Sequence, residues 1–152
     1  MDNNELLSEL LGISKLRVLE SEIVNAEEMQ FEVESVDEAA ICPECHEISI
    51  KAHGFCEEQM IRDLAYGERR CYLRYRARRF RCEKCNKTFV ERVVWKRLDV
   101  SYTLRYEKYI YQRARKEPVR QIAEEEELSE ETVQAIFEHL AKKRLRHGGT
   151  HK

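Results

Sequence analysis

The feature that most limits what this chain can fold into is a set of two Cys-x-x-Cys pairs. Cys42 and Cys45 form the first pair, and Cys82 and Cys85 form the second. A gap of two residues lets both sulfurs of a pair turn toward one ion, and two such pairs give a tetrahedral shell of four thiolates with Zn–S bonds of about 2.3 Å. The sequence therefore predicts a zinc ribbon that holds one structural Zn²⁺ ion and leaves no coordination position open for catalysis.

The expected cellular compartment favours metal over disulfides. Residues 1–12 are acidic, whereas a secretory signal peptide begins with basic residues, and no apolar run approaches the roughly 18 residues of a membrane-spanning helix. We therefore expect a cytoplasmic protein, in which thiol clusters bind metal more often than they form disulfides. Iron in the same four-cysteine cage and a redox-active dithiol are the alternatives.

Other residues near the two pairs have separate interpretations. His46 and Asn86 each follow a pair directly, and both residue types tolerate the positive φ that a tight metal-binding turn, or knuckle, often requires. We expect His46 to serve this turn and not to bind the ion. Of the two remaining cysteines, Cys71 lies on the apolar side of a predicted strand and should be a small buried side chain, whereas Cys56 lies in a predicted loop.

Charge is distributed unevenly along the chain, although the net charge is only −2. Residues 1–60 contain 15 acidic and 3 basic side chains, residues 61–116 contain 6 and 18, and residues 117–152 contain 8 and 6. Salt screens a charge beyond about 10 Å, so the local excess matters more than the total. The middle of the chain is therefore the predicted polyanion-binding surface.

Many of these basic side chains lie on a predicted long strand over residues 69–82. Apolar and polar or basic side chains alternate along it until Arg79 and Phe80 break the alternation, which indicates a bulge or twist that turns the chain into the second cysteine pair. Outward-facing arginines can hold phosphate oxygens in bidentate fashion. The predicted DNA contacts of this strand are Arg74, Arg76, Arg78 and Arg79. The alternative is that the row pairs with the acidic segment 1–60, but exposed ion pairs contribute little free energy, and we favour nucleic acid.

The rest of the sequence indicates an α+β protein, with a small β-rich zinc-ribbon module followed by a three-helix helix-turn-helix module. Near the N-terminus we expect a short helix over residues 4–12 and then an antiparallel hairpin of strands 17–24 and 29–36. The leucine stripe of the short helix comprises Leu6, Leu7, Leu10 and Leu11. We place the two domains at residues 1–98 and 99–152.

After residue 100 the hydrophobic period becomes helical. Helices are predicted over residues 101–116 and 119–126, and a third begins after its capping residue Ser129. The apolar stripe of the third helix comprises Val133, Ile136, Phe137 and Leu140. As a recognition helix, it would contact a DNA groove or phosphates through Thr132, Gln134 and Lys142.

The motifs of the whole chain occur in a specific order. They are Cys42-Pro43-Glu44-Cys45, Ile61-Arg62-Asp63-Leu64 with Gly67, Arg78-Arg79-Phe80-Arg81-Cys82, Cys85 with Phe89-Val90-Glu91, and the helix-turn-helix segment 121–133. Together they resemble the amino-terminal portion of the ISL-three family of insertion-sequence transposases. The resemblance covers nearly the whole chain and implies a zinc ribbon and a DNA-binding helix-turn-helix. Such transposases continue into a ribonuclease-H-like domain with metal-binding carboxylates, and because this sequence stops at Lys152 we expect no catalytic residues and no enzyme activity.

These observations lead to one hypothesis and one alternative. The hypothesis is a non-catalytic protein that recognises the terminal inverted repeats of a transposon, as a truncated transposase or a derived regulator. Its expected partners are double-stranded DNA and either a second copy, forming a homodimer, or a full-length transposase, with no membrane and no small-molecule substrate. We expect it to be associated with the nucleoid. The alternative is a zinc-ribbon adaptor whose acidic and basic faces dock protein partners.

Overall fold

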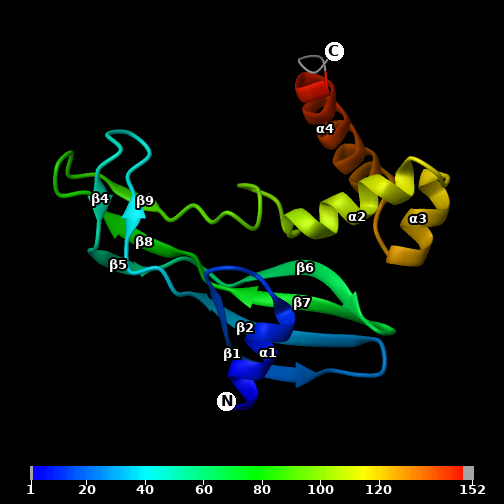
Figure 1. The fold of residues 1–152 in the computed structure, drawn as a ribbon, viewed down its shortest axis with the longest axis horizontal. Coiled ribbons are helices and arrows are strands. Elements are labelled where there is room, and N and C mark those ends of the chain that lie inside the picture. Colours follow the sequence, from blue (N-terminus) through cyan, green and yellow to red (C-terminus); the bar gives the residue numbers. More distant parts are fainter. Residues whose placement is uncertain (1, 149–152) are drawn as a thin grey trace. The chain divides into compact units, whose positions relative to one another are not determined.

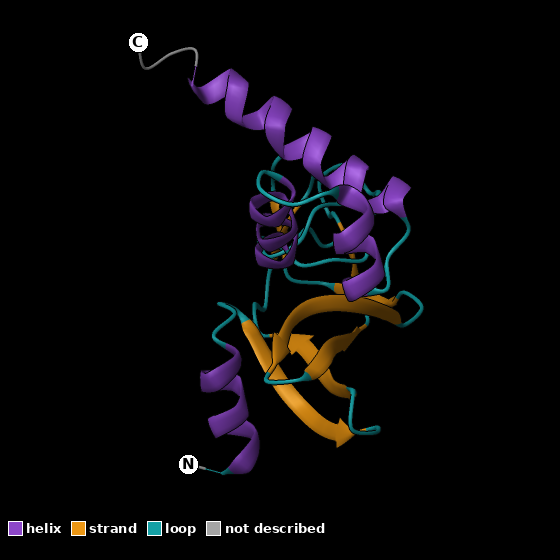
Figure 2. Ribbon diagram, turned by 90° about the vertical axis from the view of Figure 1, so that its right-hand side faces the viewer, coloured by secondary structure: helices purple, strands orange, loops and turns teal. Residues whose placement is uncertain are grey.

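The computed structural model describes residues 2–148 and divides the chain into two compact units after Thr103. The first unit is rich in strands and the second is helical, so the α+β class is confirmed (Figure 1, Figure 2). The division predicted from the sequence lay after residue 98. Among the described helices, none combines the length and the apolar character that crossing a membrane requires.

The chain begins with helix α1 (Asn3–Leu11), as predicted. The Asp2 side chain caps the helix by accepting a hydrogen bond from the Glu5 N–H at 2.7 Å, and Gly12 ends it in the left-handed conformation at φ 67°. The predicted leucine stripe is only half buried. Leu11 is fully buried and Leu7 packs against the core, but Leu6 and Leu10 are exposed, because the helix covers the sheet with one narrow face.

The first unit is built on a four-stranded sheet with the order β1-β2-β7-β6. Its strands are β1 (Leu16–Ile23), β2 (Glu28–Ser35), β6 (Gln59–Tyr66) and β7 (Arg69–Tyr75). The β1–β2 pair is the predicted antiparallel hairpin, and β6 and β7 form a second one around Gly67. The two hairpins join through a parallel pairing of β2 with β7. The core packs on one face of this sheet and includes Val18, Phe31, Val33, Ile61 and Leu73.

The predicted long strand over residues 69–82 is wrong in one respect, because it is interrupted. β7 ends at Tyr75, and the chain resumes as β8 (Arg78–Arg81) in another sheet of order β5-β8-β9, with β5 (Ala52–Phe55) and β9 (Thr88–Val90). The interruption falls at Arg76 and Ala77 rather than at Arg79 and Phe80. There the Ala77 carbonyl accepts a hydrogen bond from the Cys56 N–H at 2.8 Å. The buried carbonyl therefore keeps a hydrogen-bond donor although Ala77 lies outside both strands.

The alternation predicted for this segment is nevertheless confirmed. Cys71, Leu73, Tyr75 and Ala77 are all buried. The intervening arginines, Arg74 and Arg76, are partly and fully exposed, respectively. Cys56 lies between β5 and β6, outside both strands, as expected for a loop residue.

The second unit contains α2 (Leu104–Ala114), α3 (Val119–Glu126) and α4 (Glu130–Gly148). Helix α3 has the predicted bounds. Helix α2 is shorter than the predicted 101–116, because residues 101–103 belong to the first unit and pair with Arg62 of β6 instead. The Ser129 hydroxyl accepts a hydrogen bond from the Thr132 N–H at 3.0 Å, which confirms the predicted cap. The buried side chains of this unit include Ile110, Ile122, Val133 and Ile136.

Candidate metal centre and nucleic-acid interface

The two cysteine pairs sit on knuckles that repeat the same backbone hydrogen bonds. In the first knuckle the His46 N–H donates to the Cys42 carbonyl at 2.9 Å, and in the second the Asn86 N–H donates to the Cys82 carbonyl at 2.8 Å. Both His46 and Asn86 have φ of 62°, as their residue types predicted. Strands β3 (Ala40–Ile41) and β4 (Ile48–Ser49) flank the first knuckle, and β8 and β9 flank the second. The positions of all four sulfurs are therefore fixed by local backbone structure.

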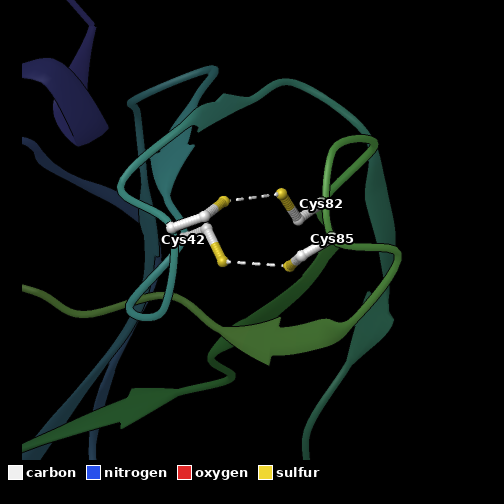
Figure 3. Close-up of side chains that lie close together, drawn as sticks. Cys42, Cys82 and Cys85 are labelled. Atoms are coloured by element: carbon white, nitrogen blue, oxygen red, sulfur yellow. Dashed lines mark hydrogen bonds between the residues drawn. The ribbon is translucent and has the colours of Figure 1, made fainter.

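The four sulfurs gather into one cage. The Cys42 Sγ lies 3.7 Å from the Cys85 Sγ, the Cys45 Sγ lies 3.4 Å from the Cys82 Sγ, and all four lie within 4.8 Å of one another (Figure 3). A tetrahedron with Zn–S bonds of about 2.3 Å has edges of about 3.8 Å, so the cage fits one zinc ion. The ring of Phe80 stacks on that of Phe89 at 6.0 Å beneath it. Four thiolates leave no position for water or substrate, and the ion's role is structural.

Backbone N–H groups favour the thiolate form of one cysteine in each knuckle. The N–H of Cys85 lowers the pKa of Cys82 to about 7, and the N–H of Cys45 lowers the pKa of Cys42. Cys85 and Cys45 themselves behave differently: although backbone N–H groups act to lower their pKa values, burial and the neighbouring sulfurs raise them. Because the bound zinc ion requires deprotonated sulfurs, it must displace protons from these thiols.

Charged side chains also join the two knuckles. Glu47 from the first knuckle accepts a hydrogen bond from the Lys84 Nζ of the second at 3.3 Å, and Glu44 pairs with Lys87 in the same way. These pairs are more than half exposed, so each contributes little to stability. They do, however, use two lysines of the basic segment for internal contacts.

The predicted phosphate-binding arginines fall into two groups. Arg74 lies beside Glu32 of the adjacent parallel strand at 3.8 Å, and Arg78 donates to the Glu91 carboxylate at 3.1 Å, with both arginine side chains largely buried. Arg76 and Arg79 are exposed, and within residues 2–148 neither has a side-chain partner. Pairing with the acidic segment 1–60, the alternative interpretation of the row, therefore applies to Arg74, whereas the partner of Arg78 lies outside that segment.

Glu91 is a structurally important residue that the sequence analysis named only as part of a family motif, without a structural role. It is 7% exposed, and its carboxylate accepts hydrogen bonds from the Tyr75 hydroxyl and the Arg78 backbone N–H, both at 2.8 Å. Burial and this carboxylate raise the pKa of Tyr75. Glu91 thus ties β7, β8 and the end of β9 together. The alternation along the chain could have indicated its burial, because Phe89 and Glu91 lie on the buried side and Val90 lies on the exposed side.

The predicted contacts on α4 have varied surroundings. Thr132 is partly buried in the helix cap, where its hydroxyl lies 2.8 Å from that of Ser129. Gln134 is exposed and donates to Glu138 at 3.1 Å. Lys142 is exposed on the same helix. All three lie in the first three to four turns of α4, with Gln134 and Lys142 open to solvent.

The acidic run before α4 is largely organised by one arginine. The Arg113 guanidinium donates to Glu117 at 2.8 Å and to Glu126 at 3.2 Å, and it also pairs with Glu125. Glu126 further accepts a hydrogen bond from the Tyr109 hydroxyl at 3.0 Å. Side-chain hydrogen bonds to Glu117 and Glu125 raise the pKa of Arg113, and the hydrogen bond from Arg113 lowers the pKa of Glu117. One arginine thus contacts three carboxylates and offsets one of their three negative charges.

Comparison with known proteins gives two family matches. Residues 38–85 match the zinc-finger of transposase IS204/IS1001/IS1096/IS1165, and residues 93–141 match the helix-turn-helix domain of transposase family ISL3. The first match contains all four cysteines of the cage, which supports the zinc assignment. The second contains α2, α3 and most of α4, together with the segment that follows Arg92. No curated protein and no solved structure matches the chain.

Proposed function

From the premise that this chain carries the zinc ribbon and the helix-turn-helix of ISL3-family transposases, we propose that it binds the terminal inverted repeats of a transposable element. It acts by occupying those ends without carrying out strand transfer, as a truncated transposase or a derived regulator that competes with a full-length enzyme. The observation that carries the proposal is the presence of both matched regions, one after the other, in a single chain. Both are domains whose family role suggests DNA binding.

In this proposal the two units have different tasks. The zinc cage fixes β8. Arg79 in this strand, and Arg76 two residues before the strand begins, reach phosphate oxygens. Arg74 and Arg78 join them only by exchanging their carboxylate partners for phosphate. The exposed side of α4 reads base edges through Gln134 and supplies backbone contacts through Lys142, with Thr132 near the helix start.

The test is a titration of the zinc-loaded protein with a fluorescent duplex that carries the inverted repeat flanking its own gene. A duplex of shuffled sequence is the matched control, and both are titrated at about 50 mM and 200 mM salt. We expect tighter binding to the repeat at both salt concentrations and steep weakening as salt rises. Failure to bind either duplex at low salt would disprove DNA binding, and equal affinity for both would disprove recognition of the ends.

One observation favours the adaptor alternative for part of the molecule. The exposed side of α4 and the start of α3 form a shallow groove lined by Val119, Glu130, Glu131, Gln134, Ala135 and Glu138. Three carboxylates there repel phosphate and suit a basic protein segment. Titration with a basic peptide in the absence of nucleic acid tests this function, because an adaptor with an acidic groove should bind the peptide. Light scattering alone does not separate the two functions, because a DNA-binding homodimer also assembles without DNA.

A further inference from the structure

Basic side chains border a groove of the first unit, and part of its lining lies in the segment 93–101 that the helix-turn-helix match includes. Arg74 and Arg78 already face carboxylates, which leaves Arg76 and Arg79 of the four arginines predicted to contact DNA. Further positive charge in this unit would therefore strengthen binding to a nucleic-acid backbone. We infer that a groove bordered by residues 90–101 binds the phosphodiester backbone of DNA. This inference rests on the proposed function and identifies a surface through which it would operate.

The groove has a volume of about 650 Å³ and lies between the connection that follows β9 and residues of the four-stranded sheet. Three basic side chains border it, namely Arg92, Lys96 and Arg97. Gln59 and Ser101 add neutral hydrogen-bond donors. Volumes of about 300–1,000 Å³ are typical of ligand sites, so a phosphate with its flanking sugars fits.

The lining of the groove has three basic and two acidic side chains, and one of the two carboxylates already pairs with an arginine. Glu91 borders it, but its carboxylate is already taken up by Tyr75 and Arg78. Asp99 is the other carboxylate among the lining residues, and it sits in a turn at φ 64°. Arg92 is exposed and, within residues 2–148, has no side-chain partner. The lining of the groove is therefore positive on balance.

The segment that carries the basic residues is held at three points along its length. Glu91 fixes its start through two short hydrogen bonds to Tyr75 and Arg78. Trp95 fixes the middle, because it is 7% exposed and its ring meets that of Tyr75 edge to face at 5.1 Å. At the end, the Thr103 hydroxyl donates to the buried Asp63 carboxylate at 2.8 Å. A segment held in this way presents its charges without a large loss of conformational entropy on binding.

A second groove of similar size in the same unit shows that the charge is specific to this place. The depression beside α1 has a volume of about 620 Å³, and its charged lining residues are Asp2, Glu5, Glu9 and Arg17. This lining is mainly acidic and repels phosphate. Size alone therefore does not select the site, whereas the sign of the charge does.

The first test replaces Arg92, Lys96 and Arg97 together by glutamine in the zinc-loaded chain. DNA affinity at 50 mM salt should fall by roughly 30-fold for both the repeat and the shuffled duplex. The slope of log K against log[salt] should become less steep by about 0.9 for each phosphate that the variant no longer neutralises. The matched control replaces Lys15, Arg17 and Lys51, which removes the same charge from exposed ion pairs elsewhere in this unit.

The control triple variant should lose less than about threefold in affinity. An equal loss in both variants would mean that only net charge matters, and an unchanged affinity in the groove variant would mean that DNA does not use the groove; either result overturns the inference while leaving DNA binding intact. Absence of binding by the unmodified protein overturns the proposed function as well. Zinc content and circular dichroism report whether each variant folds.

A second measurement on the unmodified protein avoids the risk that the variant fails to fold. N-hydroxysuccinimidyl acetate modifies accessible lysines, and mass spectrometry measures the rate at each site. Saturating shuffled duplex should slow the acetylation of Lys96 at least fivefold and that of Lys15 and Lys51 less than twofold. Equal rates for Lys96 with and without DNA would overturn the inference.

Discussion

Replacing Glu91 by glutamine tests the most densely bonded carboxylate of the zinc-ribbon unit. Its two oxygens accept from the Tyr75 hydroxyl and the Arg78 N–H at 2.8 Å, and from the Arg78 Nη2 at 3.1 Å and Nε at 3.3 Å. Glutamine keeps one acceptor oxygen but turns an NH₂ group toward one set of these donors. Charge-assisted hydrogen bonds contribute about 1.5–3 kcal/mol each, so the loss of two, partly offset by the remaining oxygen, should lower the free energy of unfolding by about 3 kcal/mol.

Urea denaturation in the presence of zinc, followed by circular dichroism, measures this change. The matched control is Glu34→Gln, because Glu34 also accepts from an arginine, Arg17 Nε at 2.9 Å, but in an exposed pair. The control should change stability by less than about 1 kcal/mol. If the two variants differ by less than about 0.5 kcal/mol, the burial of the Glu91 contacts does not stabilise the unit as argued, and the reasoning is refuted.

Three further predictions concern zinc, alkaline pH and the helical unit. Cys82→Ser, or acidification that protonates the zinc-bound thiolates, should release the ion and remove hydrogen-exchange protection from β8 and β9. Protection that persists in metal-free protein would contradict the structural role. The folded state raises the pKa of Tyr75, so this tyrosine should leave stability constant up to about pH 10, where it ionises in the unfolded chain, and lower stability above that pH. The urea midpoint measures this fall, and Tyr75→Phe should make it less steep. Ser129→Ala should destabilise the second unit by about 1 kcal/mol in thermal melts, and no change would argue against the cap.

Most of the metal centre could be predicted because its determinants are local. The two-residue gap within each pair and the tolerance of His46 and Asn86 for φ near 62° are properties of four or five consecutive residues. The helix cap at Ser129 is equally local, and it was found where expected. Only the spacing of the two pairs along the chain hinted that they meet, and the cage required the sheet between them to fold.

The surface for DNA was less predictable because it depends on which arginines meet carboxylates in the folded chain. The sequence identified a basic segment, but it could not show that Glu32 faces Arg74 or that Glu91 faces Arg78. It also placed the boundary between the two domains after residue 98, whereas the structure divides the chain after Thr103. The DNA contacts named from the sequence therefore stay predictions.

The sequence by itself determined the zinc ligands, the turns that hold them, the α+β class and the side of each strand that is buried, since these follow from short spacings and from periods of two or 3.6 residues. Only the tertiary structure decided that β2 pairs in parallel with β7, that the basic strand stops at Tyr75 and resumes in another sheet, and that Arg74 and Arg78 face carboxylates. Those outcomes depend on contacts between residues far apart in the chain. No local pattern records which of several compatible partners a strand or an arginine will meet.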